Sequence, residues 1–267
     1  MSVRRTFALL SAALAIFSGA SVAHANERHF TYTYETGVLP PGVKELEIWT
    51  TPRIGKDDYF VRFDQRMEFE VGVTDNLMTS LYLNAKAVTA DVAPGVREST
   101  YEFDGVSSEW KYKLSDPVAD AIGLGFYGEF TGSTNEVEIE AKILADKQIG
   151  NLLFAGNLVF EQEWEFEPEE TEAEQVVDLD FAAAYALSPG VRIGVEVRNT
   201  NEIAEGEWEH SALFAGPVVS YVADGWWVAA TLMPQLPALK KSDEETGSRV
   251  LSAHEKLEAR LLLSFQI

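Results

Sequence analysis

Charged side chains occupy every second position along several stretches of the sequence, a spacing that places them together on one face of a β-strand. That face is acidic around residues 138–140, 161–165 and 178–180, and elsewhere it carries arginines interleaved with acids. The candidate site residues are Arg62, Asp64, Arg66, Glu68, Glu70, Glu138, Glu140, Glu161, Glu163, Glu165, Asp178, Asp180, Arg192, Glu196, Arg198, Glu258 and Arg260. If these side chains line a pore, an acidic wall faces arginines across it and selects passing solutes electrostatically. Acids outnumber bases in this set, so such a pore is expected to favour cations.

The same residues allow a second interpretation, in which the charges pair across a narrow lumen and simply fill it. Buried charges are tolerable only when they are paired, so pairing is expected in either case. The sequence leaves both a small-solute channel and a closed structural barrel open.

Catalysis is the rival function, and the histidines are the residues to test for it. After residue 25 the histidines are His29, His210 and His254, and Ser211 follows His210 directly. Neighbouring residues of a strand point to opposite faces, so His210 and Ser211 are not expected to form a Ser–His pair. A partner from another strand stays possible. With no cysteine in the chain, thiolate metal sites and cysteine nucleophiles are excluded. We therefore predict no catalytic residue, no metal ligand and no cofactor.

The elements that carry these side chains are predicted to be long β-strands. From Leu257 to Ile267 every odd position is apolar, whereas the even positions carry mainly polar and charged residues. This period-2 alternation is longer than an ordinary soluble strand. It recurs along the chain and predicts twelve strands, at 43–53, 59–73, 77–90, 97–114, 121–131, 135–147, 151–167, 175–187, 191–202, 207–222, 226–238 and 254–267.

The predicted connections differ in length on alternate sides. One set is short and rich in Asp, Asn, Gly and Pro, as in residues 74–76, 148–150, 188–190 and 223–225. The other set is more acidic and includes the segments 168–174, 203–206 and 239–253. Short turns on one side and longer loops on the other are typical of the periplasmic and external ends of a transmembrane β-barrel.

The first 25 residues have the layout of a secretory signal peptide. Arg4 and Arg5 precede an apolar run, and Ala23-His24-Ala25 forms a small-x-small cleavage signal. Residues 26–42 are expected to be a periplasmic lead-in, because Pro40-Pro41-Gly42 ends any strand before residue 43. Residues 43–267 are expected to form the barrel. The net charge of −22 makes nucleic acid an improbable partner.

With its signal peptide, its strand count and the closing segment 257–267, the whole mature chain resembles a bacterial outer-membrane β-barrel protein of a poorly characterised family. The segments 46–53 and 69–77 also look like parts of exported barrels. The resemblance implies an all-β, transmembrane, antiparallel up-and-down β-barrel of about 12 strands in the outer membrane of a Gram-negative bacterium. Its implied partners are outer-membrane lipid, lipopolysaccharide and the barrel-assembly machinery, which would recognise residues 257–267. Outer-membrane lipid-modifying enzymes share this architecture, so that activity stays an alternative.

Three further interpretations follow from single features. The glutamate-rich stretch 167–174 is expected to be a solvated loop rather than a site for divalent cations that bridge lipopolysaccharide. The aromatic residues Trp110, Tyr112, Tyr221, Trp226 and Trp227 fit a belt at the membrane interface. A soluble barrel that binds lipid inside would need the opposite assignment of faces, with an apolar interior.

Overall fold

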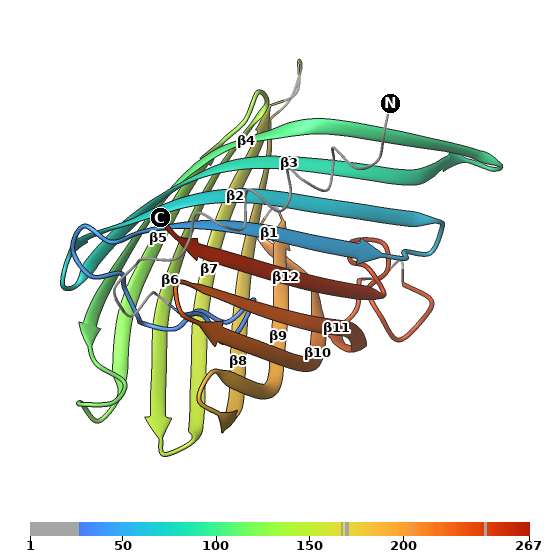
Figure 1. The fold of residues 1–267 in the computed structure, drawn as a ribbon. Helices are drawn as coiled ribbons and strands as arrows, with labels where there is room; N and C mark the ends of the chain where they lie inside the picture. Colours follow the sequence, from blue (N-terminus) through green and yellow to red (C-terminus); the bar gives the residue numbers. More distant parts are fainter. Residues whose placement is uncertain (1–26, 167, 169–170, 205, 243–244) are drawn as a thin grey trace, which may run out of the picture.

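The computed structural model describes residues 27–267 except 167, 169–170, 205 and 243–244, so the predicted signal peptide lies outside the described residues. The described chain forms twelve strands (Figure 1). They are β1 (Lys44–Ile54), β2 (Phe60–Thr74), β3 (Leu77–Ala93), β4 (Val96–Ser115), β5 (Gly123–Gly132), β6 (Glu136–Ile149), β7 (Leu152–Phe166), β8 (Thr171–Ser188), β9 (Val191–Ala204), β10 (Glu207–Ala223), β11 (Trp226–Lys240) and β12 (Leu257–Gln266). Among the residues described, no helix is both long and apolar enough to cross a membrane.

The strands make one closed sheet. Each strand pairs with its neighbours in the chain, and β1 also pairs antiparallel with β12, where Leu46 faces Phe265 and Ile54 faces Leu257. Closure leaves neither of the terminal strands with an unpaired edge. The prediction of an all-β, antiparallel up-and-down barrel of about 12 strands is confirmed.

The alternating apolar and polar residues of each strand lie on the outer and inner faces of the barrel, respectively. Large apolar side chains such as Leu81 and Phe181 point outward and are 63% and 58% exposed. Their neighbours along the strands, among them Ser80 and Asp180, are buried in the lumen. The interior is therefore polar, and the soluble alternative with an apolar, lipid-binding interior does not apply to this fold.

The two ends of the barrel differ less in loop length than the sequence predicts. Two-residue turns at 75–76, 150–151, 189–190 and 224–225 lie at the end that carries the C-terminus, which we call the short-turn end. The connection 116–122, also at this end, is longer. At the opposite, long-loop end, residues 241–256 separate β11 from β12. The predicted loop at 203–206 is wrong, because β9 ends at Ala204 and β10 begins at Glu207. The predicted loop at 168–174 is wrong, because β8 begins at Thr171 and Glu172 pairs with Glu165 of β7. The predicted aromatic belt is wrong for Trp227, which is fully buried and donates a hydrogen bond to Glu45.

The N-terminal segment, residues 27–42, lies inside the barrel. It enters the lumen from the short-turn end, where His29 contacts Ser220, and it returns to the same end, where the Gly42 amide bonds Gly72. The short stretch that carries Phe30, Tyr32 and Tyr34 is not a strand, and these three rings are 0–4% exposed. The sequence predicts a periplasmic lead-in at residues 26–42 and gives no sign that the described part of this stretch, residues 27–42, lies in the lumen.

A charge introduced on the outer face tests this assignment of faces. Leu83 points outward near the middle of β3 and is 56% exposed. We expect Leu83→Arg to destabilise the barrel folded into lipid vesicles by about 2–4 kcal/mol, the cost of an arginine near the bilayer midplane. The measurement is a urea titration that follows the heat-modifiable band on a gel.

The matched control is Tyr101→Arg, at an outward position of 78% exposure on the protruding β3–β4 hairpin. It should change the unfolding free energy by less than about 1 kcal/mol, as for positions near or beyond the interface. Equal effects of the two substitutions would contradict the placement of Leu83 against lipid.

Candidate functional site

A single buried carboxylate holds the N-terminal segment at mid-lumen. Glu196, on β9, accepts hydrogen bonds from the backbone amides of Thr31, Tyr32 and Thr33, at 3.1, 2.9 and 3.0 Å to Oε1. The hydroxyls of Thr31 and Thr231 donate to Oε2 of the same carboxylate. A buried carboxylate is costly unless it is well hydrogen-bonded, and three consecutive amides are a good cradle for it. Glu196 therefore pairs the buried amides of the segment, and these amides in turn stabilise its buried negative charge.

Two further wall residues continue this attachment toward the short-turn end. Asn157 of β7 accepts from the Tyr34 amide at 2.6 Å and donates to the Tyr34 carbonyl at 2.9 Å. Asp146 of β6 accepts from the amide and the hydroxyl of Thr36, at 3.0 and 2.7 Å. The backbone polar groups that the segment buries are thus paired by side chains of three different strands.

Glycine makes room for the segment at two points of the wall. A Cβ at Gly72 would lie 2.1 Å from the Pro40 carbonyl oxygen, and one at Gly123 would lie 2.1 Å from Asp146 Oδ1. Neither position accepts a larger residue without moving the segment or its anchor.

Arg28 places a positive charge among buried carboxylates. Its guanidinium lies 3.9 Å from the ring centroid of Tyr34 and 4.9 Å from that of Trp49, and it interacts electrostatically with Glu47 and Glu68. Cation–π contact and charge neutralisation both favour this position.

The carboxylate of Glu258 connects the segment to β1 and β9. It is fully buried on β12 and accepts from Arg198 of β9 at 2.8 Å, from Arg53 of β1 at 3.1 Å and from the Tyr32 hydroxyl at 3.2 Å. Arg260, two residues further along β12, donates to Thr51 Oγ1 at 3.0 Å and to the Thr31 carbonyl at 3.3 Å.

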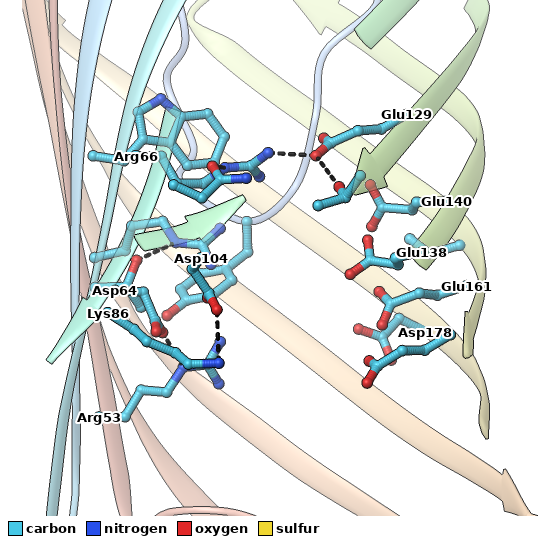
Figure 2. Close-up of a pocket in the computed structure, with 18 of the residues that line it drawn as sticks. Arg53, Asp64, Arg66, Lys86, Asp104, Glu129, Glu138, Glu140, Glu161 and Asp178 are labelled. Carbon is cyan, nitrogen blue, oxygen red and sulfur yellow. Dashed lines mark hydrogen bonds and ion pairs between the residues drawn. The ribbon is translucent and has the colours of Figure 1, made fainter. Parts of the chain in front are cut away.

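Next to the N-terminal segment, the lumen contains a charged cavity of about 400 Å³, and Tyr32 and Tyr34 of the segment are part of its lining. That volume is within the range of small-molecule sites. Figure 2 shows its two unlike walls, with Arg53, Arg66 and Lys86 on one side and a stack of acids on the other. The charged residues of the lining are Arg53, Arg62, Asp64, Arg66, Lys86, Asp104, Glu129, Glu136, Glu138, Glu140, Lys142, Glu161, Glu163, Asp178, Asp180, Arg198 and Arg260.

The basic side chains of this lining are largely neutralised. Arg53 and Arg62 both pair with Asp64, Lys86 pairs with Asp104 at 2.6 Å, and Arg66 reaches across the lumen to Glu129. Lys142 and Arg198 pair with Glu140 and Glu258.

The acidic wall is different, because many of its carboxylates have no cation. Among the described residues, no Lys, Arg or His nitrogen lies within 4.0 Å of Glu138, Glu161, Glu163, Asp178 or Asp180. Glu138 faces Glu163, Glu140 faces Glu161 and Glu136 faces Glu165 between β6 and β7. Like charges directly opposite on neighbouring strands repel. We call this ladder, together with Asp178 and Asp180 of the neighbouring β8, the acidic wall.

The structure brings many of the predicted site residues together. Those that line the cavity are Arg62, Asp64, Arg66, Glu138, Glu140, Glu161, Glu163, Asp178, Asp180, Arg198 and Arg260. Glu196 and Glu258 lie beneath it as anchors. Glu68 and Glu70 are buried beside Glu47. Glu165 lies toward the long-loop end and accepts a hydrogen bond from Asn135, and Arg192 lies near His29.

Sequence reasoning did not select several lining residues, namely Tyr32, Tyr34, Arg53, Lys86, Asp104, Glu129 and Lys142. Lys142 shares the parity of Glu138 and Glu140, and Lys86 lies on the polar face of its strand, so the alternation was sufficient to find both. Asp104 precedes a register shift between β3 and β4, where simple alternation fails.

Comparison with known proteins identifies the family. The model of a family of unknown function, DUF6662, matches residues 22–267. The chain belongs to this family. No curated protein sequence matches the chain.

Among solved structures, members of the outer-membrane β-barrel class resemble this DUF6662 protein in fold. An outer membrane channel from Pseudomonas putida F1 is 13% identical, with a TM-score of 0.59, over 87% of this chain and 98% of the channel. The NanC porin is 12% identical, with a TM-score of 0.54, over 83% and 100%. The β-domain of the Bordetella autotransporter BrkA is 9% identical, with a TM-score of 0.52, over 85% and 100%.

The histidines of the DUF6662 barrel lie in two places. His29 Nδ1 lies 3.2 Å from Ser220 Oγ, and within the described residues no carboxylate bonds its ring. That pair therefore lacks the orienting third group of a catalytic triad. His210 and His254 meet at the long-loop end with 2.8 Å between their Nε2 atoms. Burial, with smaller effects of His210 and Arg198, lowers the pKa of His254 to about 3, so this imidazole is neutral at pH 7.

Loss of the Glu196 carboxylate should release the N-terminal segment. Each hydrogen bond to a charged group contributes about 1.5–3 kcal/mol, and about 1.4 kcal/mol corresponds to a factor of ten. We expect Glu196→Ala to make trypsin cleavage after Arg28, which is 4% exposed, at least ten times faster. Mass spectrometry of the folded, detergent-solubilised barrel measures the cleavage rate.

Glu165→Ala is the control, since it removes an inward glutamate that has no contact with the segment. Cleavage at the wild-type rate in Glu196→Ala would show that this carboxylate does not hold the segment in place.

Proposed function

We propose that this protein is an outer-membrane channel for small solutes that favours cations, and that the acidic wall sets its preference. The observation that carries the proposal is that Glu138, Glu161, Glu163, Asp178 and Asp180, on β6, β7 and β8, line a cavity of about 400 Å³ without an ion pair. A cation in that cavity relieves the repulsion between the acids, whereas an anion meets basic side chains that already have partners. Rings and walls of carboxylates give cation selectivity in this way.

The outer face supports a location in the outer membrane. A band of exposed apolar side chains surrounds a polar interior, as a barrel in lipid requires. We propose that the signal peptide is removed on export, and that lipid and lipopolysaccharide surround the barrel. We also propose that β12 and Ile267 are recognised during assembly, and that the short-turn end faces the periplasm.

The N-terminal segment restricts the path of solutes through such a channel. It occupies the periplasmic half of the lumen, so solutes pass between it and the wall, or pass when it shifts. The same observation favours the alternative function of a closed structural barrel. The two differ in one measurable property, which is conductance.

Neutralising the acidic wall tests the channel and its preference together. We expect the wild-type barrel to conduct in planar lipid bilayers with a reversal potential that reports cation preference in a KCl gradient. Glu138→Gln/Glu161→Gln/Glu163→Gln should reduce the cation-to-anion permeability ratio severalfold, because it removes three unpaired negative charges from the cavity.

The matched control changes the same charge outside the lumen, as Asp57→Asn/Asp58→Asn/Glu98→Gln at exposed positions of the long-loop end. This variant should keep the wild-type ratio. An unchanged ratio in the lumen variant would make the acidic wall structural. A wild-type protein that never conducts would replace the channel with the closed barrel.

Single cysteines test the orientation, because the chain has no cysteine of its own. Gly247→Cys lies in the loop between β11 and β12, and Ala121→Cys lies in the turn between β4 and β5. A maleimide that cannot cross membranes should label Gly247→Cys on intact cells. It should label Ala121→Cys only after the outer membrane is opened. The reverse result would invert the barrel.

A further inference from the structure

Three side chains from three elements converge at the long-loop end, away from the acidic wall. They are Glu202 of β9, His210 of β10 and His254 of the loop before β12. His210 Nε2 lies 2.8 Å from His254 Nε2 and 3.4 Å from Glu202 Oε2. One ligand atom from each lies within 4.8 Å of the others.

Two of the three separations between these ligand atoms are close to those of a tetrahedral metal site. Bonds of about 2.0–2.1 Å from a zinc ion place neighbouring ligand atoms about 3.3 Å apart. The His210–Glu202 separation of 3.4 Å already matches this value, and the two histidine nitrogens need to separate by only about 0.5 Å. The imidazole rings are inclined at 77° to each other, so their Nε2 atoms meet without stacking of the rings.

The loop that presents His254 is held by its own hydrogen bonds. Ser252 donates from its amide and its hydroxyl to Glu245 Oε1 at 2.7 and 2.8 Å. The Val250 amide donates to Gln235 of β11 at 2.8 Å, and Gln235 returns a bond to the Val250 carbonyl at 2.9 Å. A ligand fixed in this way loses little conformational freedom when it binds.

The surroundings permit a cation. Arg53 and Arg198 lie near His254 and are both paired with Glu258. Lys240 and Lys56 act on His210 and Glu202, where the negative charges of Glu245 and Glu209 oppose them. Glu202 and His210 also line a cavity of about 680 Å³ at the long-loop end, which gives an ion and its remaining water ligand a path to the site.

We propose that Glu202, His210 and His254 form a binding site for a divalent transition-metal ion of the zinc type. Two imidazoles and one carboxylate suit Zn²⁺ and its neighbours, whereas Ca²⁺ and Mg²⁺ prefer oxygen ligands alone. Three protein ligands leave a fourth position for water. The bound ion joins the loop 241–256 to β9 and β10. This proposal does not depend on conduction through the lumen.

The test uses the mature barrel, folded in detergent, with Zn²⁺ and Co²⁺ as probes. Isothermal titration should show one Zn²⁺ per chain, and bound Co²⁺ should give the visible absorption bands of a tetrahedral site. His210→Ala and His254→Gln should each weaken Zn²⁺ binding at least tenfold and abolish the cobalt bands. Glu202→Gln should weaken binding by a smaller factor.

His29→Ala is the matched control, because His29 lies on the N-terminal segment outside this cluster. It should bind Zn²⁺ as the wild type does, and heat-modifiable migration confirms that every variant is folded. The proposal is overturned if folded His210→Ala and His254→Gln bind Zn²⁺ as tightly as wild type, since binding would then come from surface carboxylates. It is also overturned if wild type shows no cobalt bands.

Discussion

The pairing of β1 with β12 is the interaction on which the rest of the molecule depends. It aligns Leu46 with Phe265, and the Ile267 amide bonds the Lys44 carbonyl at 3.0 Å. In lipid, a backbone polar group without a partner costs several kcal/mol, so only a closed sheet is stable. Once the sheet closes, the parity of every strand is fixed, and a slip of one residue would turn a whole charged face toward lipid.

Closure of the barrel buries the charged inner faces of the strands in the lumen, where their carboxylates need hydrogen-bond donors. The inward faces carry more acids than bases, and the buried carboxylates need donors that the walls do not fully supply. The N-terminal segment provides them, because its amides bond Glu196, its Tyr32 hydroxyl bonds Glu258, and its Arg28 lies among Glu47 and Glu68. The segment and the wall charges therefore stabilise each other. Removing one anchor leaves buried charge behind, which costs more than a lost contact.

The sequence predicted the features that follow from the alternation along each strand. It missed the contacts between residues that are far apart in the chain. Alternation located the twelve strands to within a few residues and placed Glu138, Glu161 and Asp178 on the inner face. It could not show that Thr31 meets Glu196, because the two are 165 positions apart in the sequence. His210 and His254 are 44 positions apart on different elements, so no ligand spacing marks them. In the Trp226-Trp227 pair, parity alone decides that the second ring faces inward.

The unequal walls of the cavity follow from the order of charges along the chain. Around β1, β2 and β3 the inner face carries charges of both signs, so Arg53 and Arg62 pair with Asp64, and Lys86 pairs with Asp104. Toward the long-loop end, the inner faces of β6 and β7 each carry three glutamates, and antiparallel register sets Glu138 against Glu163 and Glu140 against Glu161. Two unit charges about 4 Å apart repel by about 4 kcal/mol at an effective dielectric constant of 20. Such a ladder is stable only when protons or cations from solution compensate it. The same register that holds the two strands together therefore makes this wall depend on compensation from solution.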